Sequence, residues 1–176
     1  NEIELKNMLY SAQLPSWGMC TIRYPRGNGI GLPWKEAPYE EIPVGKAQLL
    51  NDGKDVALLS IGTAGLSAAD AVKKAEKLGI SVLHYDMRFL KPLDLDAMRK
   101  ASECKTIITL EDASIVGGLF SAVSEYIASE GLPVKVVHLG IPDQFVEQGT
   151  VAELKAECGY DAEGILKTIL NVTQKG

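Results

Sequence analysis

The chain has 176 residues, of which 46% are hydrophobic, and its formal net charge is −5. These values are typical of a globular chain with one domain-sized core and some additional segments. The charges are spread along the sequence and form no basic stretch of the kind that binds nucleic acid. The apolar runs are far shorter than a bilayer span, and the chain opens on Asn1-Glu2-Ile3-Glu4 rather than on a charged and apolar leader. We therefore expect a cytoplasmic protein with neither nucleic-acid nor membrane partners.

The three cysteines, Cys20, Cys104 and Cys158, are odd in number and far apart in the sequence. They form no Cys-x-x-Cys pair and lie near no histidine-rich tract, so a zinc site is not indicated. We interpret all three as buried thiols rather than as metal ligands or nucleophiles.

Residues 1–44 are predicted to contain the end of one domain and a linker. Apolar residues recur at helical spacing over residues 2–13, as in a helix that is already under way, so we expect this chain to be the later part of a longer protein. A short strand is predicted over residues 19–24. Residues 28–44 are rich in glycine, proline and charge, which indicates a linker. The predicted domains are therefore residues 1–27 and 45–176.

From Gly45 onward, short apolar strands alternate with helices. Strands are predicted over residues 47–50, 56–61, 80–85, 106–110 and 134–139, and helices over residues 66–78, 95–101, 118–129 and 162–171, with a further helix beginning after Thr150. Asp94 and Asp161 are predicted N-caps, and Thr150 with Glu153 has the spacing of a capping box. The alternation indicates an α/β domain with three layers and a mixed, mostly parallel sheet.

One pair of strands is expected to be antiparallel. Residues 51–54, Asn51-Asp52-Gly53-Lys54, form a connection too short for a helical crossover. We therefore predict that the strands on either side of this turn are antiparallel neighbours.

Residues 23–29, Arg-Tyr-Pro-Arg-Gly-Asn-Gly, have the composition of an anion site. Pro25 fixes its own φ, Gly27 permits a close backbone approach, and the guanidinium groups of Arg23 and Arg26 offer planar forks to phosphate or carboxylate. The alternative is that these arginines form weak surface ion pairs beside a turn.

A glycine-rich turn at residues 62–65 could present backbone amides to an anion, with Asp86 at the distance expected for a ribose contact. However, Ser60 and Ile61 stand where the Gly-x-Gly-x-x-Gly pattern would need its first glycine. We favour a tight turn between strand and helix over a dinucleotide site.

Glu111 and Asp112 end a predicted strand just before Gly117-Gly118, where open α/β sheets usually place ligands. Paired carboxylates there could carry out acid–base chemistry or hold a cation. Helix capping, solvation or a domain contact is the interpretation that we favour.

His84 and His138 each lie in a predicted strand, and we interpret both as structural histidines rather than catalytic bases. Residues 86–94, Asp-Met-Arg-Phe-Leu-Lys-Pro-Leu-Asp, are predicted to be a strand end, a turn and a capped helix start. In this run Arg88 and Lys91 could pair with the acids around them. The sequence contains neither a Gly-x-Ser-x-Gly elbow nor a Gly-x-x-x-x-Gly-Lys loop, which excludes the commonest hydrolases and nucleoside triphosphatases.

Four segments together resemble the carboxyl-terminal third of the 1-deoxy-D-xylulose-5-phosphate synthases, a family of the transketolase superfamily. The resemblance spans nearly the whole chain. The segments are RYPRGN at 23–28, DMRFLKPLD at 86–94, EDASIVGG at 111–118, and GIPDQF at 140–145 followed by Gln148-Gly149. The Lys-Pro-Leu-Asp and Gly-Gly parts are also shared, more loosely, with transketolases and with the β subunits of 2-oxo acid dehydrogenases.

The resemblance implies a transketolase C-terminal domain, preceded by a helix and strand from the end of a pyrimidine-binding domain. It further implies a homodimeric transferase that uses thiamine diphosphate and Mg²⁺. Such an enzyme condenses pyruvate with D-glyceraldehyde 3-phosphate to 1-deoxy-D-xylulose 5-phosphate and CO2, for isoprenoid and thiamine biosynthesis. In this family the second arginine of RYPRG, here Arg26, helps to bind the acceptor phosphate. Arg23 is the second candidate, and we expect its side chain to turn into the structure or toward a neighbouring acid.

The family's cofactor motif, Gly-Asp-Gly with a downstream asparagine, is not present; the nearest match is Asn51-Asp52-Gly53. The activating glutamate and the active-site histidines are expected upstream, within domains of the same polypeptide. We therefore expect no catalytic, cofactor-binding or metal-binding residue in this chain, and no activity of the chain alone. Two alternatives are another enzyme of the superfamily, such as an oxo acid dehydrogenase β subunit, and a non-catalytic module for dimerisation or anion binding at residues 62–65.

Overall fold

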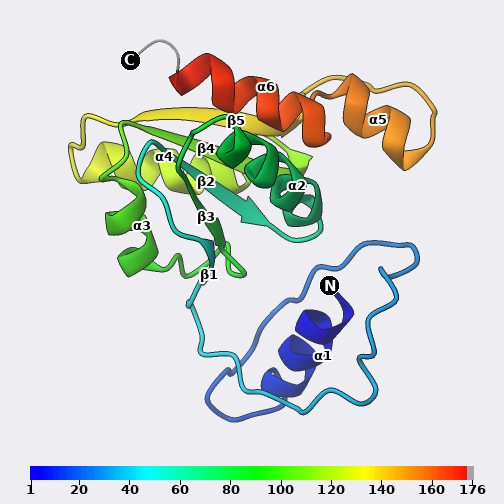
Figure 1. Ribbon diagram of the computed structural model, residues 1–176. Coiled ribbons are helices and arrows are strands. Elements are labelled where there is room, and N and C mark those ends of the chain that lie inside the picture. Colours follow the sequence, from blue (N-terminus) through cyan, green and yellow to red (C-terminus); the bar gives the residue numbers. More distant parts are fainter. Residues whose placement is uncertain (174–176) are drawn as a thin grey trace.

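A five-stranded sheet forms the centre of the computed structural model, which describes residues 1–173 (Figure 1). The strand order is β1-β3-β2-β4-β5, and every neighbouring pair is parallel except β1 with β3. The strands are β1 (Gln48–Asn51), β2 (Val56–Ile61), β3 (Val82–Asp86), β4 (Thr106–Ser114) and β5 (Lys135–Ile141). The helices are α1 (Glu2–Ser11), α2 (Ala64–Lys77), α3 (Leu95–Ala101), α4 (Leu119–Ser129), α5 (Val151–Glu157) and α6 (Ala162–Thr173).

Helices cover both faces of the sheet, because its central strands are apolar on both sides. In β2, Leu58 packs with Ile165 of α6, whereas the next residue, Leu59, packs in the cluster on the opposite face. One core contains residues of α2 and α6, and the other contains residues of α3 and α4. The predicted three-layer α/β class is therefore confirmed.

The predicted pairing of β1 with β2 is wrong, because β3 lies between them. The short connection after β1 passes across the beginning of β3. The side-chain amide of Asn51 donates to the carbonyl of Val82 at 2.8 Å, and the amide of Asp55 donates to the carbonyl of Ser81 at 2.9 Å. A Cβ at Gly53 would lie 2.3 Å from the carbonyl carbon of Val82. Because Gly53 has no side chain, the short connection can pass this close to the backbone of β3.

The predicted caps within the α/β domain are confirmed. The carboxylate of Asp94 accepts the amides of Asp96 and Ala97 at the start of α3. Thr150 and Glu153 form a capping box at the start of α5. Before α6, the carboxylate of Asp161 accepts the amide of Gly164 at 2.8 Å. These contacts fix where the helices begin.

The first 44 residues lie beside this domain, and the chain after α1 wraps back around that helix (Figure 1). The ammonium group of Lys6 donates to the carbonyl of Trp34 at 3.0 Å, and the hydroxyl of Ser11 accepts the amide of Ile42 at 2.8 Å. Residues 19–24 are irregular coil, so the predicted strand is wrong. Their β-branched residues have no neighbouring strand to pair with among residues 1–44.

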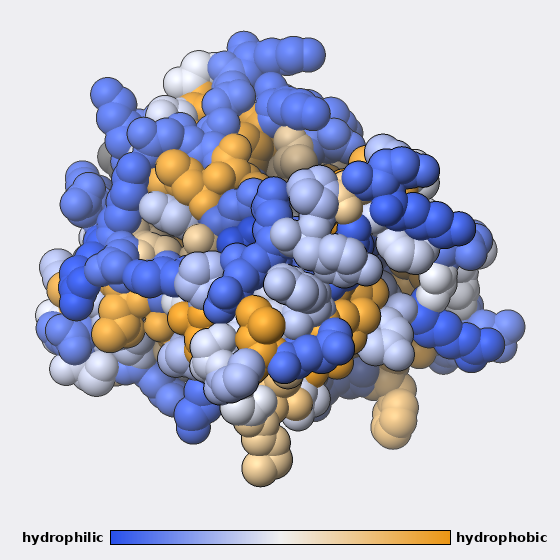
Figure 2. Space-filling model, turned by 90° about the horizontal axis from the view of Figure 1, so that it is seen from below, coloured by the Kyte–Doolittle hydropathy of each residue, from blue (hydrophilic) through white to orange (hydrophobic). Residues whose placement is uncertain are grey.

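The face that carries the N-terminal segment is mixed in polarity. Seen from this side, hydrophobic side chains form separate small patches among hydrophilic ones (Figure 2). Within residues 1–173, no helix has both the length and the apolar character needed to cross a membrane.

Candidate functional site at the carboxyl end of the sheet

The carboxyl end of β4 departs from regular pairing. β4 and β5 are in register up to Leu110 with Leu139, and the next pair is Ser114 with Ile141. Residues 111–113 of β4 therefore face a single residue of β5. Such a bulge takes backbone groups out of the ladder and is common beside functional sites.

Gly140 allows β5 to lie against this bulge. A Cβ at this position would lie 3.0 Å from the carbonyl oxygens of both Glu111 and Ala113, and 3.2 Å from a methyl group of Ile115. A side chain at this position would therefore require the neighbouring backbone of β4 to shift. The first residue of the GIPDQF segment thus serves the packing of the EDASIVGG segment.

Glu111 caps helix α4. Its side chain is buried, with 3% exposed, and its two carboxylate oxygens accept the amides of Leu119 at 2.9 Å and Phe120 at 3.1 Å. A Cβ at Gly118 would lie 1.9 Å from one of these oxygens, so a glycine is needed there. The interpretation of Glu111 as a capping residue is confirmed.

Asp112 lies between two partners. The hydroxyl of Tyr160 donates to a carboxylate oxygen of Asp112 at 2.9 Å, and the guanidinium group of Arg23 donates to its backbone carbonyl at 2.6 Å. Burial raises the pKa of Tyr160, and the hydrogen bond to Asp112 acts in the same direction, so the phenol remains a donor. Asp112 is thus a contact between the sheet and the N-terminal segment.

The two candidate arginines have different surroundings. Both are exposed, but Arg23 reaches across 89 positions of the sequence to the Asp112 carbonyl. Arg26 stands three residues further along, beyond Pro25, with its side chain exposed to solvent. Arg26 can therefore meet an anion in solution while Arg23 is bound to the sheet.

The two histidines differ as well. His84 is buried, and its Nε2 lies 2.9 Å from the hydroxyl of Ser60. Burial lowers the pKa of His84 to about 4, so it is neutral at physiological pH. His138 is exposed, and its ring lies 4.7 Å from that of Phe120. The structural interpretation is confirmed for His84, whereas His138 is a surface residue of β5.

The turn at residues 62–65 shows tight packing between strand and helix. Gly62 has a φ of +71°, and a Cβ at Gly65 would lie 3.0 Å from the hydroxyl of Ser60. Asp86 does not reach out as a ribose ligand would, since its carboxylate accepts the amide of Arg88 in its own turn at 3.0 Å. Burial raises the pKa of Asp86. These contacts agree with the tight turn rather than with a dinucleotide site.

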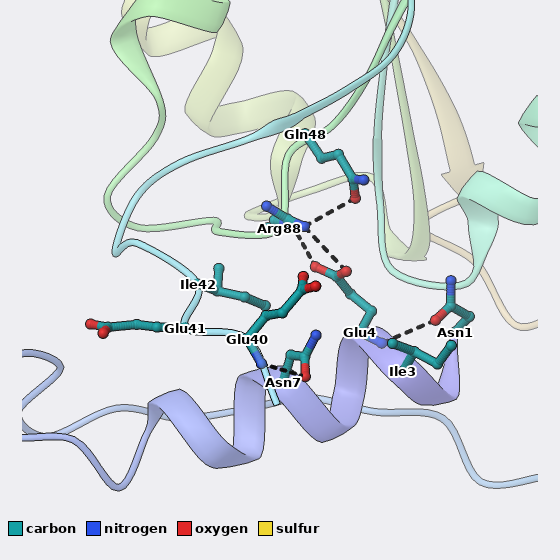
Figure 3. A pocket seen from close by; sticks show the side chains of 9 residues that line it. All are labelled: Asn1, Ile3, Glu4, Asn7, Glu40, Glu41, Ile42, Gln48 and Arg88. Carbon is teal, nitrogen blue, oxygen red and sulfur yellow. Dashed lines mark hydrogen bonds and ion pairs between the residues drawn. The ribbon is translucent and has the colours of Figure 1, made fainter. Parts of the chain in front are cut away.

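A second polar cluster joins α1 to the sheet (Figure 3). Arg88 Nε lies 2.5 Å from a carboxylate oxygen of Glu4, and Arg88 Nη2 donates to the side-chain oxygen of Gln48 at 3.0 Å. These residues line a cavity of about 330 Å³, together with Asn1, Ile3, Asn7, Glu40, Glu41 and Ile42. Sequence reasoning placed the partners of Arg88 nearby, whereas Glu4 is 84 positions away. No local pattern in the sequence indicates this pair.

The nearest match to the cofactor motif lies at the end of β1 and in the connection that follows it. Asp52, the acid of the nearest match to the cofactor motif, forms an ion pair of 2.7 Å with Lys100. Among residues 1–173, no three histidine, cysteine, aspartate or glutamate side chains come together as metal ligands. Cys104 is buried and Cys158 is partly buried, but Cys20 is exposed in the irregular coil, so its predicted burial is wrong.

Comparison with known proteins places this arrangement in a family. Residues 45–165 match the family described as transketolase, C-terminal domain. The chain belongs to this family. The 1-deoxy-D-xylulose-5-phosphate synthase of Bacteroides thetaiotaomicron is 48% identical to this chain over 172 residues. The aligned part covers 97% of this chain and 26% of that enzyme. The enzyme of the same name from Bacteroides fragilis is 47% identical over 171 residues, with 96% and 26% covered.

A solved structure supports the same assignment. It is described as a split gene transketolase in an inactive beta4 tetramer, and it aligns with a TM-score of 0.72 at 32% identity. The alignment covers 82% of this chain and 47% of that one. The resemblance stated from the sequence motifs is thereby confirmed. The chain spans about a quarter of the length of the curated relatives that it matches.

Proposed function

We propose that this chain belongs to a 1-deoxy-D-xylulose-5-phosphate synthase of the cytoplasm, which serves isoprenoid and thiamine biosynthesis. The observation that carries the proposal is 48% identity over 97% of the chain to a synthase of that name. The enzyme condenses pyruvate with D-glyceraldehyde 3-phosphate and releases CO2. Thiamine diphosphate supplies the carbanion chemistry when bound, and we assign its binding, with Mg²⁺, to domains outside this chain.

In this proposal, Arg26 binds the phosphate of the acceptor. Its exposure to solvent supports this role, as does the contact that keeps Arg23, three residues earlier, occupied with Asp112. A guanidinium fork matches two phosphate oxygens, and charge-assisted hydrogen bonds of this kind contribute about 1.5–3 kcal/mol.

The test is steady-state kinetics of the full-length enzyme. Arg26→Ala should raise the KM for glyceraldehyde 3-phosphate about 10- to 100-fold and leave the KM for pyruvate unchanged. Arg99→Ala is the matched control, because Arg99 is an exposed arginine of α3 whose partner, Asp96, is also exposed. An equal effect on both substrates, or none on either, would contradict the role of Arg26. Failure of the full-length protein to use pyruvate with glyceraldehyde phosphate would instead favour another enzyme of the superfamily.

The chain alone is proposed to be inactive and unable to bind the cofactor. The ion pair of Asp52 with Lys100 supports this, because it occupies the acid of the nearest match to the cofactor motif. Calorimetry of the chain with thiamine diphosphate and Mg²⁺ should show no binding isotherm, and a clear isotherm would overturn this part of the proposal.

We also propose a homodimer for the full-length enzyme, with the upstream domains of the same polypeptide in contact with residues 1–44. The similar transketolase structure is described as a tetramer of one chain type, which supports self-association. Light scattering of the full-length protein should give the mass of two chains.

A further inference from the structure

We propose that Arg23 is a positioning residue. Its hydrogen bond to the Asp112 carbonyl holds residues 23–29, the segment that contains Arg26, at the carboxyl end of β4. This inference rests on the proposed role of Arg26 as the phosphate ligand. It assigns separate tasks to the two arginines of one short segment. Arg26 meets the substrate, and Arg23 fixes the backbone that carries Arg26.

The acceptor of this hydrogen bond is available because of the bulge in β4. The last pair between β4 and β2 is Glu111 with Ile61, and pairing with β5 is interrupted between Leu110 and Ser114. The carbonyl of Asp112 thus lies outside both ladders and accepts the guanidinium proton of Arg23 at 2.6 Å. In an uninterrupted ladder, such a carbonyl would be occupied by the neighbouring strand.

The residues around the Asp112 carbonyl are themselves held in place, so this carbonyl can fix the position of an exposed segment. Before Asp112, the side chain of Glu111 is buried and accepts two amides of α4. The side-chain carboxylate of Asp112 in turn accepts a hydrogen bond from the hydroxyl of Tyr160, a residue that is only 4% exposed. Residues of β4, α4 and the loop before α6 therefore all hold this carbonyl in place.

The spacing of the two arginines transmits this restraint. Arg26 follows Arg23 by three residues, and Pro25 between them has a fixed φ. A segment bound at Arg23 therefore presents Arg26 within a narrow range of positions. Restricting a ligand-binding group before the substrate arrives reduces the ordering cost of binding.

The test again uses the full-length synthase. Arg23→Ala should raise the KM for glyceraldehyde 3-phosphate about tenfold, with the KM for pyruvate unchanged. With D-glyceraldehyde, which lacks the phosphate, Arg23→Ala and the parent enzyme should have equal kcat/KM. Arg23→Lys retains a charged donor and should recover most of the loss. The double variant with Arg26→Ala should be no weaker than Arg26→Ala alone, since Arg23 acts through Arg26.

A second variant avoids any change in the segment itself. Tyr160→Phe removes the hydrogen bond to Asp112 and should cause a smaller rise, about threefold, in the KM for glyceraldehyde 3-phosphate only. If Arg23→Ala weakens both acceptors equally, or neither of these variants moves the KM, then the inference is overturned. In that event a selective effect of Arg26→Ala would still support the proposed function, whereas its absence would remove the proposed function itself.

Discussion

Replacing Glu111 by alanine should destabilise the domain, because this carboxylate caps α4 from inside the core. The variant removes the acceptor of two hydrogen bonds, to the amides of Leu119 and Phe120. Leu119 is fully buried, so water cannot readily replace the lost acceptor. An unpaired buried amide costs about 1–3 kcal/mol, and the loss of an N-cap costs about 0.5–2 kcal/mol.

Because these two costs overlap, we expect Glu111→Ala to lower the free energy of unfolding by about 3 kcal/mol. For a chain of this size, that loss corresponds to a fall in Tm of about 6–12 °C. Urea denaturation and thermal scans of residues 1–176 both measure the change. Glu125→Ala is the matched control, because Glu125 is an exposed residue of the same helix, and it should change stability by less than about 0.5 kcal/mol.

Glu111→Gln should have an intermediate effect on stability. It keeps one oxygen that can accept an amide proton, but it places an NH2 group against the second amide, so we expect a loss between those of the control and the alanine variant. If Glu111→Ala is as stable as the Glu125→Ala control, then the capping contacts contribute nothing and the explanation of the EDASIVGG segment is refuted.

Three further predictions concern other parts of the chain. Burial lowers the pKa of His84 to about 4, so the unfolded chain takes up a proton first as the pH falls below 6.5. Stability should therefore drop by about 2 kcal/mol between pH 7 and pH 5, and urea titrations of His84→Gln should lack this drop. Arg88→Ala should increase amide exchange in α1 about tenfold through loss of the Glu4 pair, and unchanged exchange there would contradict the role of Arg88. Gly140→Ala should lower the free energy of unfolding by about 1–3 kcal/mol in a denaturant titration. If the variant is as stable as the parent, then the close packing of β5 against the bulge does not require glycine.

The α/β domain was predictable because its signals are local. The apolar run of residues 56–61 is observed as β2 at the predicted bounds, and the predicted caps at Asp94, Thr150 and Asp161 are confirmed by hydrogen bonds. Each of these features depends on side chains within a few positions of one another. Local patterns of this kind can be read without knowledge of the topology.

The errors arose where distant segments decide the structure. The connection after β1 looks like a hairpin turn from its length, but β3, which comes after β2 in the chain, lies between β1 and β2 in the sheet. The strand predicted over residues 19–24 has β-branched residues but no strand to pair with among residues 1–44. Cys20 is exposed for the same reason, since it lies in that coil.

The candidate site was predicted in part. Sequence reasoning identified Arg23 and Arg26, as well as Glu111 and Asp112, as separate features of two segments. It did not connect them, because the contact of Arg23 is with a backbone carbonyl 89 positions away. Side-chain identity carries no information about such an acceptor, and only the bulge in β4 makes the carbonyl available.

The contacts that attach residues 1–44 to the sheet differ in how strongly salt can screen them. The residues of both core clusters lie at or beyond Ala47, whereas the attachment rests on Arg88 with Glu4, Arg23 with Asp112, and the neighbouring rings of Trp17 and Phe89. Salt screens charge-assisted contacts at the surface, but it does not weaken burial of apolar side chains. Concentrated electrolyte should therefore weaken the exposed contact of Arg23, whereas the Arg88–Glu4 pair, whose side chains are only 16% and 19% exposed, is screened much less. The layered domain should keep its fold.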